Sequence, residues 1–282
     1  MKGGFTVPSH NPHRIAILAL GIITVIIFLA VFADAVAPHN PNRIDLPFAL
    51  SPPSWSWSEH FLGTDMLGRD ILSRIIYGAR ISLLVGIGAV FLASVIGISL
   101  GLISACEEGW IGEGIMRITD LVLSLPSILI ALVAAATIGP SLINVIFIIS
   151  FIYWAQFARM VRGEALSIKV KDFVMFATLS GSGLLRVMWR HLLPNLMNTV
   201  IVLGTLQLAS AIILEATLSF LGVGVPPPTP TWGLILSEGR PYLNSSWWIV
   251  TFPGVAIMLT VLSINILGDW LRDILDPKQR QL

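Results

Sequence analysis

The chain has 282 residues, of which 55% are hydrophobic and only 12% are charged, and its formal net charge is +1. A soluble domain carries about 25% charged residues, so a water-soluble globule of this length would lack the charge to cover its surface. The abundance of apolar residues excludes disorder, and the balanced charge gives no reason to expect a nucleic-acid partner. The long apolar runs favour an all-α integral membrane protein over a β-barrel, whose strands alternate in short segments.

Six apolar stretches approach the length of about 20 residues that a membrane span needs. The first follows a polar N-terminus (residues 1–14), and we expect an uncleaved transmembrane helix at 15–37 rather than a cleaved signal peptide, the less favoured alternative. The other five are predicted at 81–106, 117–138, 142–161, 196–214 and 248–268, with a Gly-Pro-Ser turn at 139–141. These five form a core at 81–270, followed by a tail at 271–282.

The basic residues predict the orientation of these spans. An even number of spans places both termini on one side, and cytoplasmic loops carry an excess of Lys and Arg. If the termini are cytoplasmic, five of the 17 basic residues lie outside, and the other 12 lie inside. The five are Arg43, Arg69, Arg74, Arg80 and Arg240. The same orientation places an aromatic belt on the outer side, made of Trp55, Trp57, Trp232, Trp247 and Trp248.

The segment 38–80 is predicted to be extracytoplasmic and to contain an amphipathic helix. Its apolar positions at helical spacing are Leu67, Ile71, Leu72, Ile75 and Ile76. Thr64 or Asp65 is expected to cap this helix, and Asp70 is expected to pair with Arg74 at a spacing of four. Two interpretations remain open: a helix that lies on the membrane surface, or a lid or docking surface over an entrance.

The loop 163–195 is predicted to be cytoplasmic. It is cationic overall but carries an apolar cluster made of Phe173, Val174, Met175, Phe176 and Leu179. The Gly-Ser-Gly sequence at 181–183 permits a turn between two short helices, and Pro194 marks the start of the next span. An exposed apolar cluster of this kind either inserts into a groove of a cytoplasmic protein or packs on its own spans or the lipid interface.

Several motifs of known chemistry are absent or misleading. No P-loop sequence occurs, so the chain is not expected to bind ATP itself. The stretch Gly97-Ile98-Ser99-Leu100-Gly101 matches a hydrolase nucleophile pattern, but no span interior supplies a histidine, so close helix packing is the favoured interpretation. The five histidines are scattered, no metal site is expected, and the single cysteine, Cys106, excludes an internal disulfide. Asp120 and Glu215 lie toward span ends, so no charge relay within the membrane is predicted.

Four stretches of the sequence resemble permeases of ABC importers. The loop pattern is Glu164-Ala165-Leu166, then Gly181, then His191-Leu192-Leu193-Pro194-Asn195. The dipeptide/oligopeptide subfamily is indicated by Leu62-Gly63-Thr64-Asp65 with Gly68-Arg69-Asp70, by Leu218–Gly222 with Pro227–Gly233, and by Asn265–Pro277. The resemblance covers nearly the whole chain and is specific for the second of the two permease subunits of that subfamily.

The resemblance implies a type I ABC importer permease fold with six transmembrane helices and both termini in the cytoplasm of a bacterial cell. It implies an ATPase-coupling loop that includes Glu164, Ala165, Phe173, Met175, Phe176, Ala177, Gly181, Leu193 and Pro194. It also implies an extracytoplasmic docking or gate surface that includes Gly63, Thr64, Asp65, Gly68, Arg69, Asp70, Arg74, Pro228 and Trp232. In one place the sequence departs from the family, because Met175-Phe176-Ala177 stands where Glu-Ala-Ala is usual.

The resemblance further implies the partners. They are a homologous permease subunit, two ABC ATPase subunits that bind ATP and Mg²⁺, and an extracytoplasmic substrate-binding protein. This chain would bind no cofactor and would not be an enzyme. Its substrate would be a di- or oligopeptide or a similar small solute, such as a nickel chelate, glutathione or a sugar. Two other classes are weighed against it: an ion-coupled secondary carrier, disfavoured because the six spans show no internal repeat, and a membrane enzyme that uses Ser99.

Overall fold

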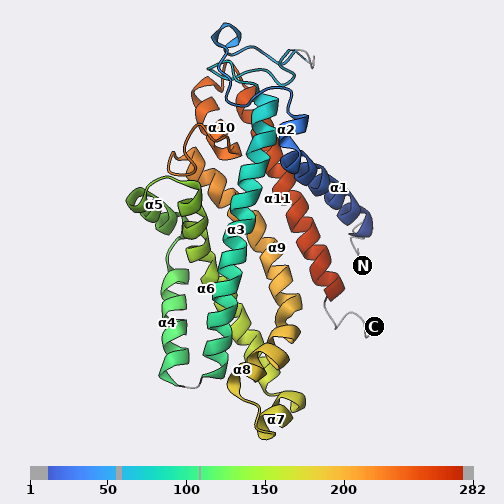
Figure 1. Ribbon diagram of the computed structural model, residues 1–282, viewed down its shortest axis with the longest axis vertical. Helices are drawn as coiled ribbons and strands as arrows, with labels where there is room; N and C mark the ends of the chain where they lie inside the picture. The colour runs from blue at the N-terminus through green and yellow to red at the C-terminus, as the bar shows by residue number, and fades with distance from the viewer. Residues whose placement is uncertain (1–11, 55–58, 108, 276–282) are drawn as a thin grey trace, which may run out of the picture.

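Long helices of the computed structural model run side by side along its long axis (Figure 1). The structure describes residues 12–54, 59–107 and 109–275. Predictions that concern residues 1–11 and 276–282, and the tryptophans Trp55 and Trp57, lie outside the described residues. Within the described residues the secondary structure is helical apart from one isolated bridge between Thr64 and Asp70.

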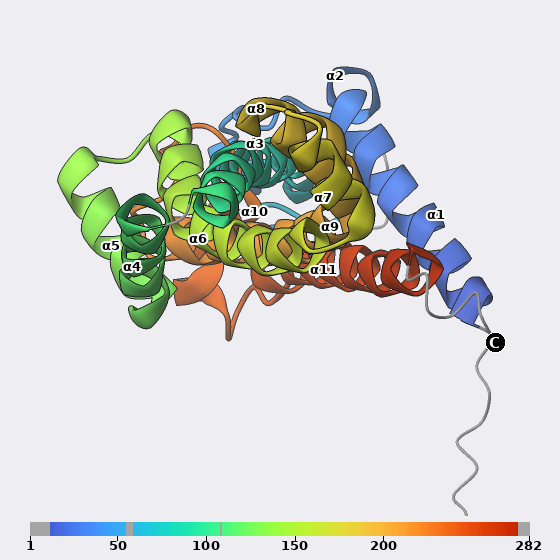
Figure 2. The same ribbon diagram turned by 90° about the horizontal axis from the view of Figure 1, so that it is seen from below.

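Five helices of the described chain are long and apolar enough to cross a membrane. They are α1 (Pro12–Val31), α3 (Ile71–Cys106), α6 (Leu142–Lys169), the continuous helix from Leu184 to Phe220 that ends in α9 (Leu193–Phe220), and α11 (Trp248–Leu275). Viewed from below, α1 and the α4–α5 pair lie on opposite flanks (Figure 2). The predicted multi-pass helical architecture is therefore confirmed.

Glycines bring α3 and α6 into close contact. A Cβ atom on Gly97 would lie 2.4 Å from the Cβ of Phe157, and one on Gly101 would lie 2.8 Å from the carbonyl oxygen of Ala158. Ser99, between these glycines, is exposed, and its hydroxyl donates to the carbonyl oxygen of Val95. The Gly-x-Ser-x-Gly stretch therefore packs two helices together, as the sequence predicts, because only hydrogen fits at the contact.

The third predicted span, 117–138, is a broken pair of helices. The structure has α4 (Trp110–Ser124) and α5 (Ser127–Ile138), which meet at an angle of 92°. The break contains Pro126, whose ring removes a backbone donor and disfavours a helical residue before it. Counted as one span, the pair raises the number of spans in the described chain from five to six.

The predicted boundaries of two other elements also change. The fifth span was expected at 196–214, but α8 (Leu184–Arg186), the π-helical η2 (Val187–Leu192) and α9 run on as one helix. The second of the two short helices predicted in the loop is therefore the beginning of this long helix. The first predicted span, 15–37, divides at Phe32 into α1 and the short α2 (Ala33–Val36).

The two ends of the molecule differ in structure. One end holds residues 38–54 and 59–70, with η1 (Leu46–Phe48), together with α10 (Trp232–Gly239) and η3 (Arg240–Tyr242) (Figure 1). The opposite end holds α7 (Asp172–Leu179) and α8. The long helices thus separate the two segments that the sequence singled out.

Candidate functional site

Helix α7 presents an apolar surface to solvent. The exposed fractions of its large side chains are 44% for Phe173, 52% for Met175, 67% for Phe176 and 77% for Leu179. Only Val174 points inward, with 1% exposure. Exposed apolar clusters of this kind are typical of interaction sites. The alternative that the whole cluster packs back on the chain's own helices is not what the structure shows.

The turn after α7 requires a glycine. Gly181 has a φ of +83° and follows a helix end in which its N–H donates to Thr178 and that of Ser182 donates to Ala177. A Cβ on Gly181 would meet nothing within 4 Å, so the requirement is conformational and not steric. Left-handed backbone costs a residue with a Cβ about 1 kcal/mol, which explains a glycine here.

The other predicted coupling residues lie on α6, α7 and α9 and differ in exposure. Near the end of α6, Ala165 is fully buried and Glu164 is exposed. Ala177 is half-buried, and Pro194 is exposed in the first turn of α9. Leu193 packs partly against the core. The apolar face of α7 therefore contains only part of the predicted set.

A buried ionic cluster, defined here as Asp65, Arg69, Arg74 and Glu238, lies at the opposite end. Asp65 Oδ2 accepts from Arg69 Nε at 2.6 Å and from Arg74 Nη1 at 2.5 Å. Glu238 Oε2 accepts from Arg69 Nη2 at 2.8 Å and forms an ion pair with Arg74 Nη1 at 2.7 Å. Two cations and two anions balance, and the cluster links the loop before α3 to α10.

The four side chains of this ionic cluster are largely shielded from water, so the loss of one of them should be costly to stability. The residues Asp65, Arg69 and Arg74 are 1%, 6% and 0% exposed, and the Glu238 side chain is 14% exposed. The backbone N–H groups of Leu67 and Arg69 also donate to Asp65 Oδ1. Removing one partner of a buried ion pair leaves an uncompensated charge, at a cost of about 3–5 kcal/mol.

The structure corrects two sequence predictions in this segment. Asp70, not Thr64 or Asp65, caps the helix, since α3 begins at Ile71 and Asp70 Oδ2 accepts from the N–H of Ser73 at 2.8 Å. Arg74 pairs with Asp65 and Glu238 and not with Asp70. The helix is continuous with the second span, so it is not a separate helix on a membrane surface. The Asp70 carboxylate is instead occupied by the free N–H and the hydroxyl of Ser73 and by His60.

The remaining docking-surface predictions fall on the loop before α3, on the loop before α10 and on the first residue of α10. A Cβ on Gly68 (φ +73°) would lie 1.8 Å from the carbonyl oxygen of Asp45, so only glycine fits there. Gly63 has a φ of +80°, and its Cβ would lie 2.6 Å from the carbonyl oxygen of Ser51. Trp232 is 1% exposed, and its Nε1 donates to the carbonyl oxygen of Ile75 at 3.0 Å. Pro228 is exposed. Most of the residues predicted for the docking surface are therefore buried and support the fold of this end of the molecule.

The sequence missed several polar residues. Glu238 was not predicted because nothing in its own segment indicates a partner about 170 positions away. Glu215 lies toward the end of α9, as expected, but its burial was not foreseen: it is fully buried, and its carboxylate accepts from Ser82 at 2.9 Å and from Ser219 at 2.8 Å. His39 and His60, which looked scattered, lie beside Asp70.

Comparisons with known proteins identify the family. Residues 97–281 match the binding-protein-dependent transport system inner membrane component, and residues 12–53 match the N-terminal TM domain of oligopeptide transport permease C. The chain belongs to the ABC importer permease family. This membership confirms the resemblance inferred from the loop and segment motifs.

Two relatives and one solved structure extend this finding. The chain is 44% identical to the di/tripeptide transport system permease of Pseudomonas aeruginosa (strain UCBPP-PA14), over 96% of this chain and 89% of that protein. It is 43% identical to the dipeptide transport system permease of Escherichia coli (strain K12), over 94% of this chain and 90% of that protein. A chain of the inward-facing MetNI methionine ABC transporter shares the fold, with a TM-score of 0.60 and 17% identity over 73% of this chain and 98% of that one. This multi-pass protein is a permease subunit.

Proposed function

We propose that the chain is one of two permease subunits of an ATP-driven importer that moves di- or oligopeptides across the bacterial cytoplasmic membrane. Support comes from family membership and from two relatives, 44% and 43% identical, that are named for di/tripeptide and dipeptide transport. The alternative is the same transporter class with a non-peptide substrate, such as a nickel chelate, glutathione or a sugar.

The proposed topology has six spans, with α4 and α5 crossing together as one broken span. Both termini then lie in the cytoplasm, and residues 38–70 and α10 lie outside. The excess of Lys and Arg in the segments assigned to the cytoplasm supports this orientation. So does the separation of α7 from residues 38–70 at opposite ends of the helices (Figure 1).

The observation that carries the proposal is the exposed apolar face of α7. We propose that it seats in a groove of an ABC ATPase, one of two that bind ATP and Mg²⁺. Since the chain lacks a P-loop sequence, ATP would be bound and hydrolysed by these partners and not by this chain. Met175 and Phe176, in place of the usual Glu-Ala, would make this contact apolar rather than ionic.

The remaining partners are proposed from the same family membership. A homologous permease would complete the pathway, and an extracytoplasmic binding protein would deliver substrate to the end that holds residues 38–70 and α10. The buried ionic cluster supports this role. It links the loop before α3 to α10, so the two segments form one rigid surface to which a partner can bind.

The test uses the chain reconstituted with its permease, ATPase and binding-protein partners in proteoliposomes. Replacing Phe176 and Leu179 by Ser together should lower substrate-stimulated ATP hydrolysis and dipeptide uptake at least tenfold, while the chain still inserts. The matched control is Trp110→Ser, because Trp110 is 84% exposed but lies on α4, outside the docking face.

Three outcomes contradict the proposal. They are uptake by the chain without its ATPases, loss of uptake when the proton gradient is collapsed at constant ATP, and full coupling in the α7 double variant. The first two would indicate a secondary carrier. If labelled nickel chelate, glutathione or sugar is taken up and dipeptide is not, the transporter class stands and the peptide substrate is wrong.

A further inference from the structure

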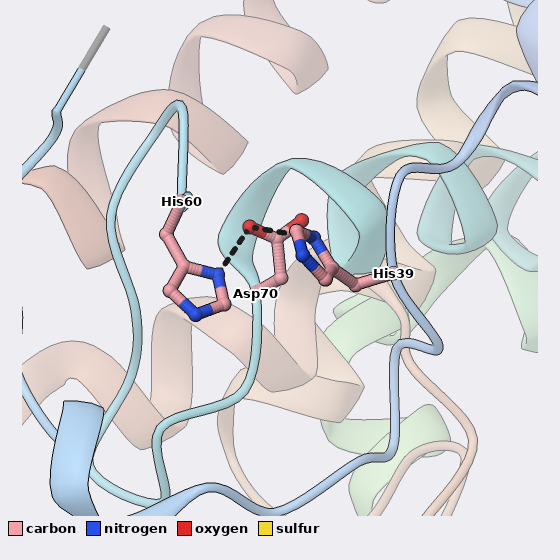
Figure 3. Close-up of side chains that lie close together, drawn as sticks. All are labelled: His39, His60 and Asp70. Atoms are coloured by element: carbon pink, nitrogen blue, oxygen red, sulfur yellow. Dashed lines mark hydrogen bonds and ion pairs between the residues drawn. The ribbon is translucent and has the colours of Figure 1, made fainter. Parts of the chain in front are cut away.

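Three potential metal ligands converge beside the start of α3. The Nδ1 atom of His60 lies 3.0 Å from Asp70 Oδ1, and that of His39 lies 3.8 Å from the same oxygen. Figure 3 shows the two imidazoles approaching this carboxylate from separate segments of chain. One ligand atom from each of the three residues lies within 4.8 Å of the others.

These separations suit a small divalent ion. Zinc binds histidine nitrogen and carboxylate oxygen at about 2.0–2.2 Å with tetrahedral geometry, which places neighbouring ligand atoms about 3.3 Å apart. The distances from His60 and His39 to Asp70 Oδ1, 3.0 Å and 3.8 Å, fall on either side of that value, and all three ligand atoms lie within 4.8 Å of one another.

The carboxylate is already held in position. Ser73 donates to Asp70 Oδ2 twice, from its backbone N–H at 2.8 Å and from its hydroxyl at 2.7 Å. The backbone N–H of His39 in turn donates to the Ser73 hydroxyl oxygen at 3.0 Å. One oxygen of Asp70 is thus occupied, while the other faces the imidazoles. Such outer hydrogen bonds are typical of metal sites, where they orient the ligands.

Protein hydrogen bonds leave one of these ligands unsatisfied. The Nδ1 atom of His39 is buried and has no hydrogen-bond partner in the described part of the chain. Asp70 Oδ1 already pairs with His60, and the two imidazole rings lie with centroids only 4.8 Å apart. A cation between the rings could bind one nitrogen of His39, one nitrogen of His60 and Asp70 Oδ1 at the same time. A single proton can be shared by only two of these three atoms.

The surroundings favour a cation and leave room for a fourth ligand. A cavity of about 200 Å³ opens beside the cluster, and Asp45, Glu59 and Arg43 help to line it. Arg43 is exposed, so water screens its charge, and the carboxylates outnumber it. Three protein ligands and one open position are the arrangement of an accessible zinc site.

We infer that His39, His60 and Asp70 bind a divalent transition-metal ion, of which Zn²⁺ fits best. The ion would tie two separate points of the preceding chain, His39 and His60, to Asp70 at the N-cap of α3. This inference stands on the geometry of the chain and does not depend on the proposed function.

The test is zinc titration of the full-length chain in lipid nanodiscs, purified without a histidine tag. We expect one Zn²⁺ per chain, with affinity falling about 100-fold or more in His39→Gln and in His60→Gln. These two variants leave the Asp70 cap of α3 intact, so the fold is preserved. His13→Gln is the matched control, because His13 is exposed and outside the cluster.

X-ray absorption of the zinc-loaded chain supplies a second measurement. It should show two imidazole nitrogens in the first coordination shell, with an oxygen ligand at about 2.0–2.2 Å. Failure of the wild-type chain to bind Zn²⁺, or equal affinity in the wild type and the His39→Gln/His60→Gln double variant, would overturn the inference. A shell without imidazole, or with four imidazoles from two chains, would also overturn it.

Discussion

The ionic cluster gives the sharpest stability prediction. Replacing Glu238 by Gln keeps the shape of the side chain but leaves Arg69 and Arg74 with a single carboxylate. Asp65 cannot compensate for both guanidinium groups, since Arg74 is fully buried and its Nε and Nη2 atoms have no hydrogen-bond partner among the described residues. Glu238 itself is 14% exposed, so the cost should lie at the low end of the range for broken buried pairs, about 3 kcal/mol.

The free energy of unfolding can be measured in mixed detergent micelles by far-ultraviolet circular dichroism. Glu113→Gln is the matched control, because Glu113 is exposed on α4 and its replacement should change stability by less than about 0.5 kcal/mol. A Glu238→Gln variant as stable as this control would refute the reasoning.

A double-mutant cycle separates charge balance from simple damage to the packing. Combining Arg69→Met with Glu238→Gln removes one cation and one anion, so the Asp65–Arg74 pair remains balanced. The double variant should be less destabilised than the sum of the single variants by about 1–3 kcal/mol. Additive effects would mean that the four side chains do not act as one neutral unit.

Three other substitutions test separate parts of the structure. Gly68→Ala should destabilise residues 38–70, seen as faster proteolysis, because its Cβ would lie 1.8 Å from a carbonyl oxygen; Gly21→Ala, with nothing within 4 Å, should not. Trp232→Phe loses a buried hydrogen bond and should cost about 1 kcal/mol of unfolding free energy, whereas Trp247→Phe, at a side chain that is 52% exposed, should cost less. Gly181→Ala should speed hydrogen exchange in α7, because a left-handed residue with a Cβ costs about 1 kcal/mol. Unchanged exchange would show that the turn is not strained.

Hydropathy predicted most of the architecture because burial of apolar side chains in lipid depends on composition over about 20 residues, which is a local property. The close packing at Gly97 and Gly101 was predictable because the spacing of two small residues on one helix face is also a local property. The break between α4 and α5 was not, because a proline in an apolar run is compatible with either a kink or a right-angled turn. Which one forms depends on the helices that pack against it.

The sequence alone determined that this protein lies in a membrane, that α7 carries an apolar cluster and that the chain resembles an importer permease. The tertiary structure decided which charges meet. Local spacing favoured a pair between Asp70 and Arg74. In the structure Asp70 instead caps α3. Arg74 is buried and pairs with Asp65 and with Glu238 on α10. The same folding brings His39 and His60 together. Partners far apart in the sequence are chosen by desolvation and by the shape of the completed fold, and neither can be read from spacing along the chain.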